Sequence, residues 1–230
     1  MKIAVIIPVV NQNLANSLLA SIERNSIKPI KILIIDNTSV KVGYKYPSNL
    51  PITYFKPYKP MSVNESWRYG FENIGKCDAV AVLNDDLVLN KEFFYRTARA
   101  LTPKGVGVSC PFTVSNLDEL REYPRDKFEI VGMGKREGWA FTVKKSVLDQ
   151  LPPLPDHVVK TFYGDDWIYF WTAKLRRWEW VKDKNNWVWH KGSVTVKRLG
   201  LAKMQKREKN AYHEHRVMTY NKWLKENKRG

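Results

Sequence analysis

The sequence has 230 residues, of which 43% are hydrophobic and 27% are charged, and its formal net charge is +16 at pH 7. This length allows one domain with a sizeable core and a C-terminal extension, and the composition is ordinary for a soluble globular protein. No apolar run is long enough to span a membrane, and two cysteines make no disulfide framework, so we expect a cytoplasmic protein with reduced thiols, peripheral at most to a membrane.

The N-terminal third of the sequence alternates strand and helix patterns. Residues 2–8 and 30–35 are short runs rich in β-branched residues, which is typical of parallel strands covered on both faces. Residues 52–55 predict a third strand. Strands that alternate with helices indicate βαβ units and a mainly parallel, doubly wound α/β sheet.

Two helices are predicted between these strands. Apolar residues recur at helical spacing in residues 11–25, with Asn13 as the expected N-cap. Residues 62–74 predict the second helix, because Ser62 and Glu65 have the spacing of a capping box.

The next predicted strand, residues 79–83, runs directly into Asn84, Asp85 and Asp86. Open α/β sheets bind their ligands at the carboxyl ends of the strands. Adjacent carboxylates repel each other unless a cation lies between them, and hard divalent ions prefer carboxylate and phosphate oxygens. This junction therefore indicates a metal–phosphate site, although a solvated turn at the end of the strand would explain it as well.

Beyond residue 103 the pattern becomes less regular. We expect a long surface loop over residues 115–137 and an aromatic-rich helix over residues 162–175 that begins with Asp165 and Asp166. Further short strands are predicted at residues 105–111, 138–143 and 186–190.

The positive charge is concentrated at the C-terminus. Residues 174–230 hold 17 Lys and Arg against 5 Asp and Glu, and residues 201–227 predict a basic amphipathic helix. Its expected apolar stripe consists of Leu201, Met204, Tyr212, Val217, Tyr220 and Leu224. Such a helix could bind a polyanion, either nucleic acid, an anionic glycan or a membrane surface, or it could simply pack on the catalytic domain.

Six short segments occur in a fixed order along the chain. They are residues 7–11 (Ile-Pro-Val-Val-Asn), 34–39 (Ile-Ile-Asp-Asn-Thr-Ser), 83–86 (Leu-Asn-Asp-Asp), 138–141 (Gly-Trp-Ala-Phe), 163–167 (Tyr-Gly-Asp-Asp-Trp) and 189–193 (Trp-His-Lys-Gly-Ser). Over residues 3–197, this order resembles the family 2 glycosyltransferases of GT-A fold, and the last segment is similar to galactofuranosyltransferase-like members.

The resemblance implies a domain organisation and a metal site. Residues 1–197 would be the catalytic domain, with a nucleotide-sugar half over 1–102, an acceptor half over 103–197 and a basic helical tail over 198–230. The family's acidic motif here begins with Asn84 in place of aspartate, so Asp86 and His190 are the expected ligands of Mn²⁺ or Mg²⁺. A lone histidine can also be a packed core residue.

The resemblance also implies a nucleotide-sugar donor, expected to be a UDP-sugar whose uracil contacts Asp36. A local Asx-turn would explain Asp36 equally well. The residues expected at the donor site are Pro8, Asn11, Asp36, Asn64, Arg68, Asn84, Asp85, Lys191 and Ser193.

Asp166 is the expected general base of an inverting transfer of a hexose or pentose, because the positive end of a helix dipole keeps a carboxylate ionised. Asp165, Trp139 and Trp167 are expected to contact the acceptor. The alternative is that both aspartates merely cap the helix.

The acceptor is the least determined part of the prediction. A compact basic enzyme favours hydroxymethylated pyrimidine in DNA, as modified by bacteriophage enzymes after base flipping, over a cell-surface glycan or lipopolysaccharide. The alternatives from other classes are a nucleotidyltransferase and a non-catalytic nucleic-acid-binding α/β module.

Overall fold

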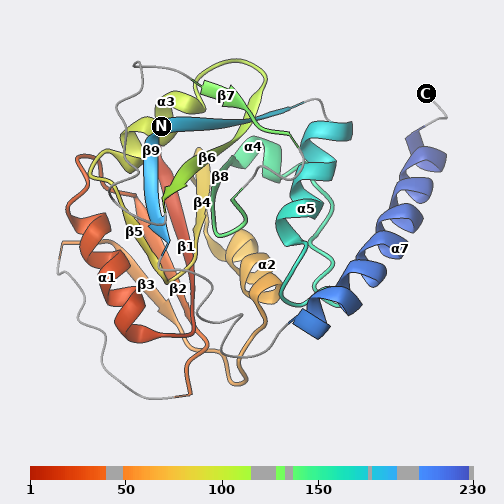
Figure 1. The fold of residues 1–230 in the computed structure, drawn as a ribbon, viewed down its shortest axis with the longest axis horizontal. Helices are drawn as coiled ribbons and strands as arrows, with labels where there is room; N and C mark the ends of the chain where they lie inside the picture. The colour runs from red at the N-terminus through yellow and green to blue at the C-terminus, as the bar shows by residue number, and fades with distance from the viewer. Residues whose placement is uncertain (40–48, 115–127, 133–136, 176–177, 191–201, 228–230) are drawn as a thin grey trace.

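A single sheet with helices on both faces organises the chain (Figure 1). The computed structural model describes residues 1–39, 49–114, 128–132, 137–175, 178–190 and 202–227. The strands are β1 (Ile3–Val9), β2 (Lys31–Asp36), β3 (Ile52–Phe55), β4 (Ala79–Leu83), β5 (Leu87–Leu89), β6 (Val106–Val114), β7 (Phe128–Ile130), β8 (Ala140–Lys144) and β9 (Glu179–His190). The helices are α1 (Gln12–Glu23), α2 (Val63–Asn73), α3 (Phe93–Ala100), α4 (Lys145–Leu148), α5 (Gly164–Tyr169), a π-helix (Phe170–Leu175) and α7 (Ala202–Asn227).

The strands lie in the order β3-β2-β1-β4-β8-β6-β9-β5, and β7 pairs with β9 at the side of this path. The pairs β3–β2, β2–β1, β1–β4 and β6–β9 are parallel, whereas β4–β8, β8–β6, β9–β5 and β7–β9 are antiparallel. The prediction of a mainly parallel sheet is therefore right for the N-terminal half and wrong for the rest, and the sheet is mixed.

Each face of the sheet has its own hydrophobic core, because successive side chains of a strand point to opposite faces. Along β1, Ile3, Val5 and Ile7 pack with α1 and α3, while Ala4 and Ile6 pack with α2, α4 and α5. Figure 1 shows the same arrangement, with α1 and α3 on one side of the strands and α2, α4 and α5 on the other. Because helices cover both faces of the sheet, the ends of its strands are the parts that remain accessible.

The N-termini of the first two helices are fixed by their caps. The capping box of Ser62 and Glu65 is confirmed at the start of α2. The prediction of Asn13 as the cap of α1 is wrong, because the side chain of Asn11 accepts hydrogen bonds from the backbone N–H groups of Asn13 and Leu14. Helix α1 therefore begins directly after β1.

Two later elements differ from their prediction. Strand β9 begins at Glu179 and not at Asn186. Its first half is rich in charged residues, but this segment lies between β6 and β7 and pairs with both strands. The single helix expected over residues 162–175 is α5 followed by the π-helix. Within the π-helix, the Thr172 hydroxyl donates to the Ile168 carbonyl at 2.8 Å and accepts from Trp180 Nε1 at 2.6 Å.

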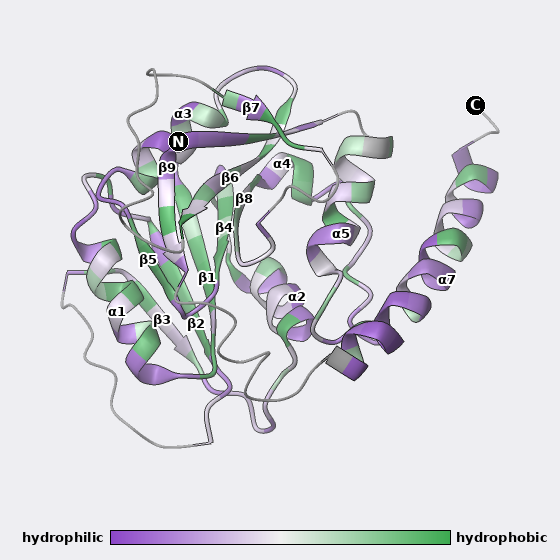
Figure 2. Cartoon of the chain, viewed as in Figure 1, coloured by the Kyte–Doolittle hydropathy of each residue, from purple (hydrophilic) through white to green (hydrophobic). Residues whose placement is uncertain are grey.

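Helix α7 lies beside α5, and its C-terminal end extends away from the sheet (Figure 1). Tyr212 and Trp223 pack against the core that contains α5. The predicted apolar stripe is wrong at Met204 and Val217, whose side chains are exposed by 38% and 53%. Figure 2 shows α7 mostly in the hydrophilic colour, with hydrophobic residues interspersed along it. Within the described part of the chain, no helix is both long and apolar enough to cross a membrane.

Candidate active site

The carboxyl ends of β4 and β9 bring Asp86 and His190 together, although the two residues are 104 positions apart in the sequence. Strand β5, which follows Asp86, runs antiparallel to β9 so that Leu87 lies opposite His190. His190 Nε2 lies 3.0 Å from Asp86 Oδ2, and the two side chains are exposed by 12% and 8%. The structure thus places the two predicted metal ligands side by side, while their role as ligands stays a prediction.

The second carboxylate oxygen of Asp86 is the feature that best fits a cation. Oδ1 is buried and has no hydrogen-bond partner among the described residues. A buried anionic oxygen without a partner costs free energy, and a divalent ion removes that cost. The 3.0 Å contact between His190 Nε2 and Asp86 Oδ2 is itself within hydrogen-bond distance, so the unpartnered Oδ1 is the observation that supports a cation here. Among the described residues, no group of three or more His, Cys, Asp or Glu side chains forms a complete metal site.

Asp85 ties this edge of the sheet to the turn between β1 and α1. Its Oδ2 accepts hydrogen bonds from the backbone N–H groups of Val10 at 2.8 Å and Asn11 at 2.7 Å. Burial raises the pKa of Asp85 to about 6, and the neighbouring charge of Asp86 adds to this, against the two backbone hydrogen bonds. The carboxylate predicted to contact the donor is therefore also an anchor for the β1–α1 turn.

Gly138 and Trp139 connect the Asp86–His190 pair to the start of α5. The ring of Trp139 stacks on His190 with centroids 4.8 Å apart and an interplanar angle of 14°, and its carbonyl accepts a hydrogen bond from Asn84 N. A Cβ atom on Gly138 would lie 3.0 Å from the carboxylate carbon of Asp165. One dipeptide thus contacts both the proposed metal pair and the first of the two α5 aspartates.

The start of α5 has an unusual backbone. Tyr163, the residue before the helix, has a φ of 64° and is in the left-handed conformation, which non-glycine residues rarely adopt. Asp165 and Asp166 follow in the first turn and are half-buried. Burial raises the pKa of the Tyr163 hydroxyl, and the negative charge of Asp166 adds to this.

Gly164 is required by close packing at this point. A Cβ atom there would lie 2.2 Å from Asn64 Oδ1 and 2.9 Å from the Trp67 ring.

We expect Gly164→Ala to lower the free energy of unfolding by about 1–3 kcal/mol, the usual cost of overpacking, as measured by urea denaturation. Gly132→Ala is the matched control, since no atom lies within 4 Å of its added methyl group. Equal stabilities of the two variants would contradict this packing.

Three of the predicted site residues, Asn64, Arg68 and Trp167, make contacts within the protein. Asn64 is fully buried, and its side-chain amide donates to the carbonyls of Val159 and Phe162. The guanidinium of Arg68 on α2 forms ion pairs with Asp156 and with Glu72, which lies one turn further along the same helix. Trp167 is 1% exposed, so its ring cannot stack on an acceptor. The burial of Asn64 and Trp167 contradicts their predicted donor and acceptor contacts. The side chain of Arg68 is 43% exposed, and its donor contact stays a prediction.

Asp36 lies at the carboxyl end of β2, where its carboxylate is surrounded by donors. Tyr54 Oη donates to Oδ2 at 2.6 Å, Lys56 Nζ lies 3.2 Å from the same oxygen, and Thr38 N donates to Oδ1 at 2.8 Å. Burial opposes ionisation, but these hydrogen bonds outweigh it and lower the pKa of Asp36. Tyr54 and Lys56 were not predicted from the sequence; Tyr54 lies on β3 beside β2, and Lys56 follows β3 directly.

The other predicted donor residues lie at or near the same edge. Pro8 is buried near the end of β1 and is paired with Ile35 of β2. Asn11 caps α1, and Asn84 follows β4 directly. Lys191 and Ser193 lie outside the described residues, as does Leu201 of the predicted stripe.

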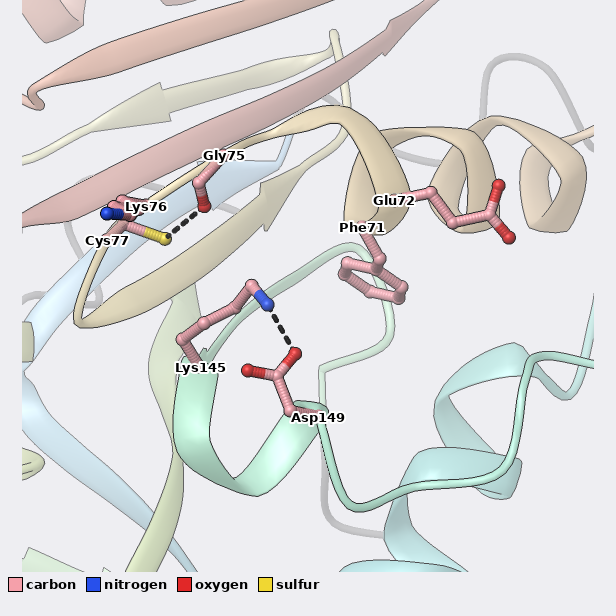
Figure 3. A pocket seen from close by; sticks show the side chains of 7 residues that line it. All are labelled: Phe71, Glu72, Gly75, Lys76, Cys77, Lys145 and Asp149. Atoms are coloured by element: carbon pink, nitrogen blue, oxygen red, sulfur yellow. Dashed lines mark hydrogen bonds and ion pairs between the residues drawn. The ribbon is translucent and has the colours of Figure 1, made fainter.

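A shallow hollow of about 430 Å³ lies at the opposite edge of the sheet (Figure 3). It is lined by Phe71, Glu72, Gly75, Lys76, Cys77, Lys145 and Asp149. Cys77 precedes β4 and Lys145 follows β8, whereas Asp86 and Trp139 lie at the other ends of these antiparallel strands. Burial raises the pKa of the Cys77 thiol, which disfavours a reactive thiolate. We therefore assign no catalytic role to this hollow.

Comparisons with known proteins agree with the geometry. The model of the family described as "Glycosyl transferase family 2" matches residues 4–157. No curated protein sequence matches the chain significantly.

Several solved structures share the fold. GalNAc-T7, solved with UDP, GalNAc and Mn²⁺, superposes with a TM-score of 0.67 at 10% identity over 82% of this chain and 43% of its own. Staphylococcus aureus TarS 1–349 with UDP-GlcNAc gives 0.61 at 13% identity over 82% and 58%. The mannosyltransferase PcManGT of Pyrobaculum calidifontis, with GDP-Man and Mn²⁺, gives 0.62 at 11% identity over 90% and 62%. The chain thus spans between about two fifths and three fifths of these proteins.

Proposed function

Because this chain belongs to glycosyl transferase family 2, we propose that it transfers a sugar from a nucleotide sugar to a hydroxyl group of an acceptor. The observation that carries the proposal is the pair of Asp86 and His190 at the carboxyl edge of the sheet, with one buried carboxylate oxygen lacking a partner among the described residues. Residues 1–102 would bind the donor and residues 103–197 the acceptor, with residues 198–230 as a basic tail.

Asp86 and His190 would hold a divalent cation, Mn²⁺ or Mg²⁺, together with the diphosphate of the donor. Such an ion neutralises the negative charge that develops on the departing diphosphate. The structures solved with Mn²⁺ and either UDP or GDP-Man support this assignment. Trp139, stacked on His190, keeps the imidazole ring in the orientation that presents Nε2 to Asp86.

We propose a UDP-sugar as the donor. The ionised carboxylate of Asp36 would accept a hydrogen bond from the N3–H group of uracil at the end of β2, where its side chain is 1% exposed and already accepts hydrogen bonds from Tyr54 and Thr38. Tyr54 and Lys56 hold this carboxylate in place from the neighbouring strand. UDP or UDP-GlcNAc occupies two of the similar structures, and GDP-Man occupies another, so both nucleotides belong in the assay.

Asp166 is the proposed general base, with inversion at the transferred carbon. Its carboxylate would take the proton of the acceptor hydroxyl as that oxygen attacks the sugar. Asp166 lies in the first turn of α5. Asp165, which lies against Gly138, would orient the acceptor, and the half-buried face of Trp139 would contact it.

For the acceptor, we propose hydroxymethylated pyrimidine in DNA ahead of an anionic cell-surface glycan, for an enzyme of the cytoplasm. The exposed lysines and arginines of α7 support a polyanionic acceptor.

The test is incubation of the protein with Mn²⁺ and a mixture of UDP- and GDP-sugars, with hydroxymethylated DNA and lipopolysaccharide as separate acceptors. Mass spectrometry should show a hexose or pentose added to the DNA. Addition to lipopolysaccharide alone would overturn the DNA assignment.

Binding to DNA should depend steeply on salt, because each phosphate contact releases counterions. We expect the affinity for a DNA duplex to fall at least about tenfold between about 50 and 200 mM salt, as measured by fluorescence anisotropy. An affinity that is independent of salt would contradict phosphate recognition by the basic tail.

A further inference from the structure

The segment just before α5 is held by a single buried carboxylate from the C-terminal helix. The Glu208 carboxylate accepts hydrogen bonds from three consecutive backbone N–H groups, those of Lys160 at 3.0 Å, Thr161 at 3.1 Å and Phe162 at 2.9 Å. Glu208 is 5% exposed, and glutamate is rarely buried unless it is paired. A carboxylate that binds three N–H groups fixes the direction of the backbone that carries them.

The same segment is held from its other side by α2. Asn64 Nδ2 donates to the carbonyls of Val159 at 3.0 Å and Phe162 at 2.9 Å, and Asn64 N donates to the Lys160 carbonyl at 2.9 Å. The N–H groups of residues 160–162 thus face α7, while the carbonyls of residues 159, 160 and 162 face α2. Loss of the Glu208 carboxylate would leave the three N–H groups without their partner, while the hydrogen bonds from Asn64 of α2 remain.

This segment leads directly into the turn that carries Asp165 and Asp166. Tyr163, the next residue, is in the left-handed conformation, and its ring stacks on Tyr212 of α7 with centroids 5.3 Å apart and an interplanar angle of 16°. Asp165 and Asp166 follow after Gly164, whose neighbours leave no room for a side chain. The contacts from α7 therefore hold the backbone that leads into α5, and with it the positions of Asp165 and Asp166.

We propose that Glu208 is a positioning residue for the acceptor side of the reaction, acting through the backbone of residues 160–162 on Asp165 and Asp166. This inference rests on the proposed function. Helix α7 would then have a second role besides binding a polyanion. Its buried Glu208 would couple this helix to Asp166, the proposed general base. The hydrogen bonds that Glu208 and Asn64 make to this segment do not involve Asp86 or His190, so we expect binding of the donor and metal to be unchanged when Glu208 is replaced.

The test compares the wild type with Glu208→Gln, which keeps the shape of the side chain but turns one oxygen into an amide that opposes a backbone N–H group. Glu214→Gln is the matched control, since Glu214 lies on the same helix and is exposed. We expect Glu208→Gln to lower kcat for transfer about 10- to 100-fold and to speed hydrogen exchange at residues 160–162. The affinity for UDP with Mn²⁺ and the KM for the donor should be unchanged.

Glu208→Asp is the second variant, in case Glu208→Gln does not fold. It keeps the charge but is one methylene shorter, so kcat should be intermediate at an unchanged donor KM.

A kcat in the folded variants equal to that of the wild type, or an equal loss of kcat and of UDP affinity, would overturn the positioning role and leave the proposed function intact. A wild type that neither binds UDP nor turns over any donor would overturn the proposed function itself, and this inference with it.

Discussion

Replacing Asp166 by asparagine is expected to lower the rate of sugar transfer by about 10²- to 10⁴-fold, the usual contribution of a general base. Asparagine has the same shape but cannot accept the proton of the acceptor hydroxyl. Because the predicted donor and metal contacts lie at β2 and at the Asp86–His190 pair, the affinity for UDP and Mn²⁺ should be unchanged. The measurement is steady-state transfer with a saturating donor, together with calorimetric binding of UDP.

Two companion variants make this prediction specific. Asp149→Asn removes an exposed carboxylate at the opposite edge of the sheet, so its transfer rate should equal that of the wild type. Asp165→Asn should raise the KM for the acceptor more than it lowers kcat. If Asp166→Asn keeps its activity while Asp165→Asn loses it, the role of the base belongs to Asp165.

The second large effect is expected at the metal pair. Asp86→Asn and His190→Ala should each lower turnover by about 10²- to 10³-fold at a fixed Mn²⁺ concentration, because the charge developing on the diphosphate loses its counter-charge. Asp86→Asn keeps the volume of the side chain but gives up the anionic oxygen that is buried without a partner among the described residues. Turnover should be measured across a range of Mn²⁺ concentrations, and half-saturation should shift to higher metal in both variants.

His213→Ala is the matched control for His190→Ala, because His213 is exposed on α7. Its dependence on Mn²⁺ should follow that of the wild type. A His190→Ala variant with the same metal dependence and turnover as the wild type would show that His190 is a packing partner of Trp139 and not a ligand.

The sequence predicted best those parts of the molecule that depend on local pattern. The apolar runs of β1, β2 and β4, the capping box of α2 and the carboxylates after β4 are all visible within a few residues. The convergence of Asp86 and His190 needed the order of motifs that the family shares, since no local pattern relates residues 104 positions apart.

What the sequence could not show depends on contacts between distant segments. Asn64 and Trp167 look like polar and aromatic site residues, but Asn64 binds the carbonyls of residues 159 and 162, and Trp167 packs against α7. Likewise, nothing in the sequence near Glu208 indicates its three hydrogen bonds to the segment before α5. Each of these roles is set by a partner that only the fold brings into contact.

The most direct test of the account is a calorimetric titration of UDP into the protein with and without Mn²⁺, for the wild type and for Asp86→Asn. If Asp86 and His190 hold a cation that binds the diphosphate, Mn²⁺ should tighten UDP binding at least about tenfold in the wild type. Asp86→Asn should remove that gain. An affinity for UDP that is the same in all four titrations would contradict a metal–diphosphate site at the ends of β4 and β9.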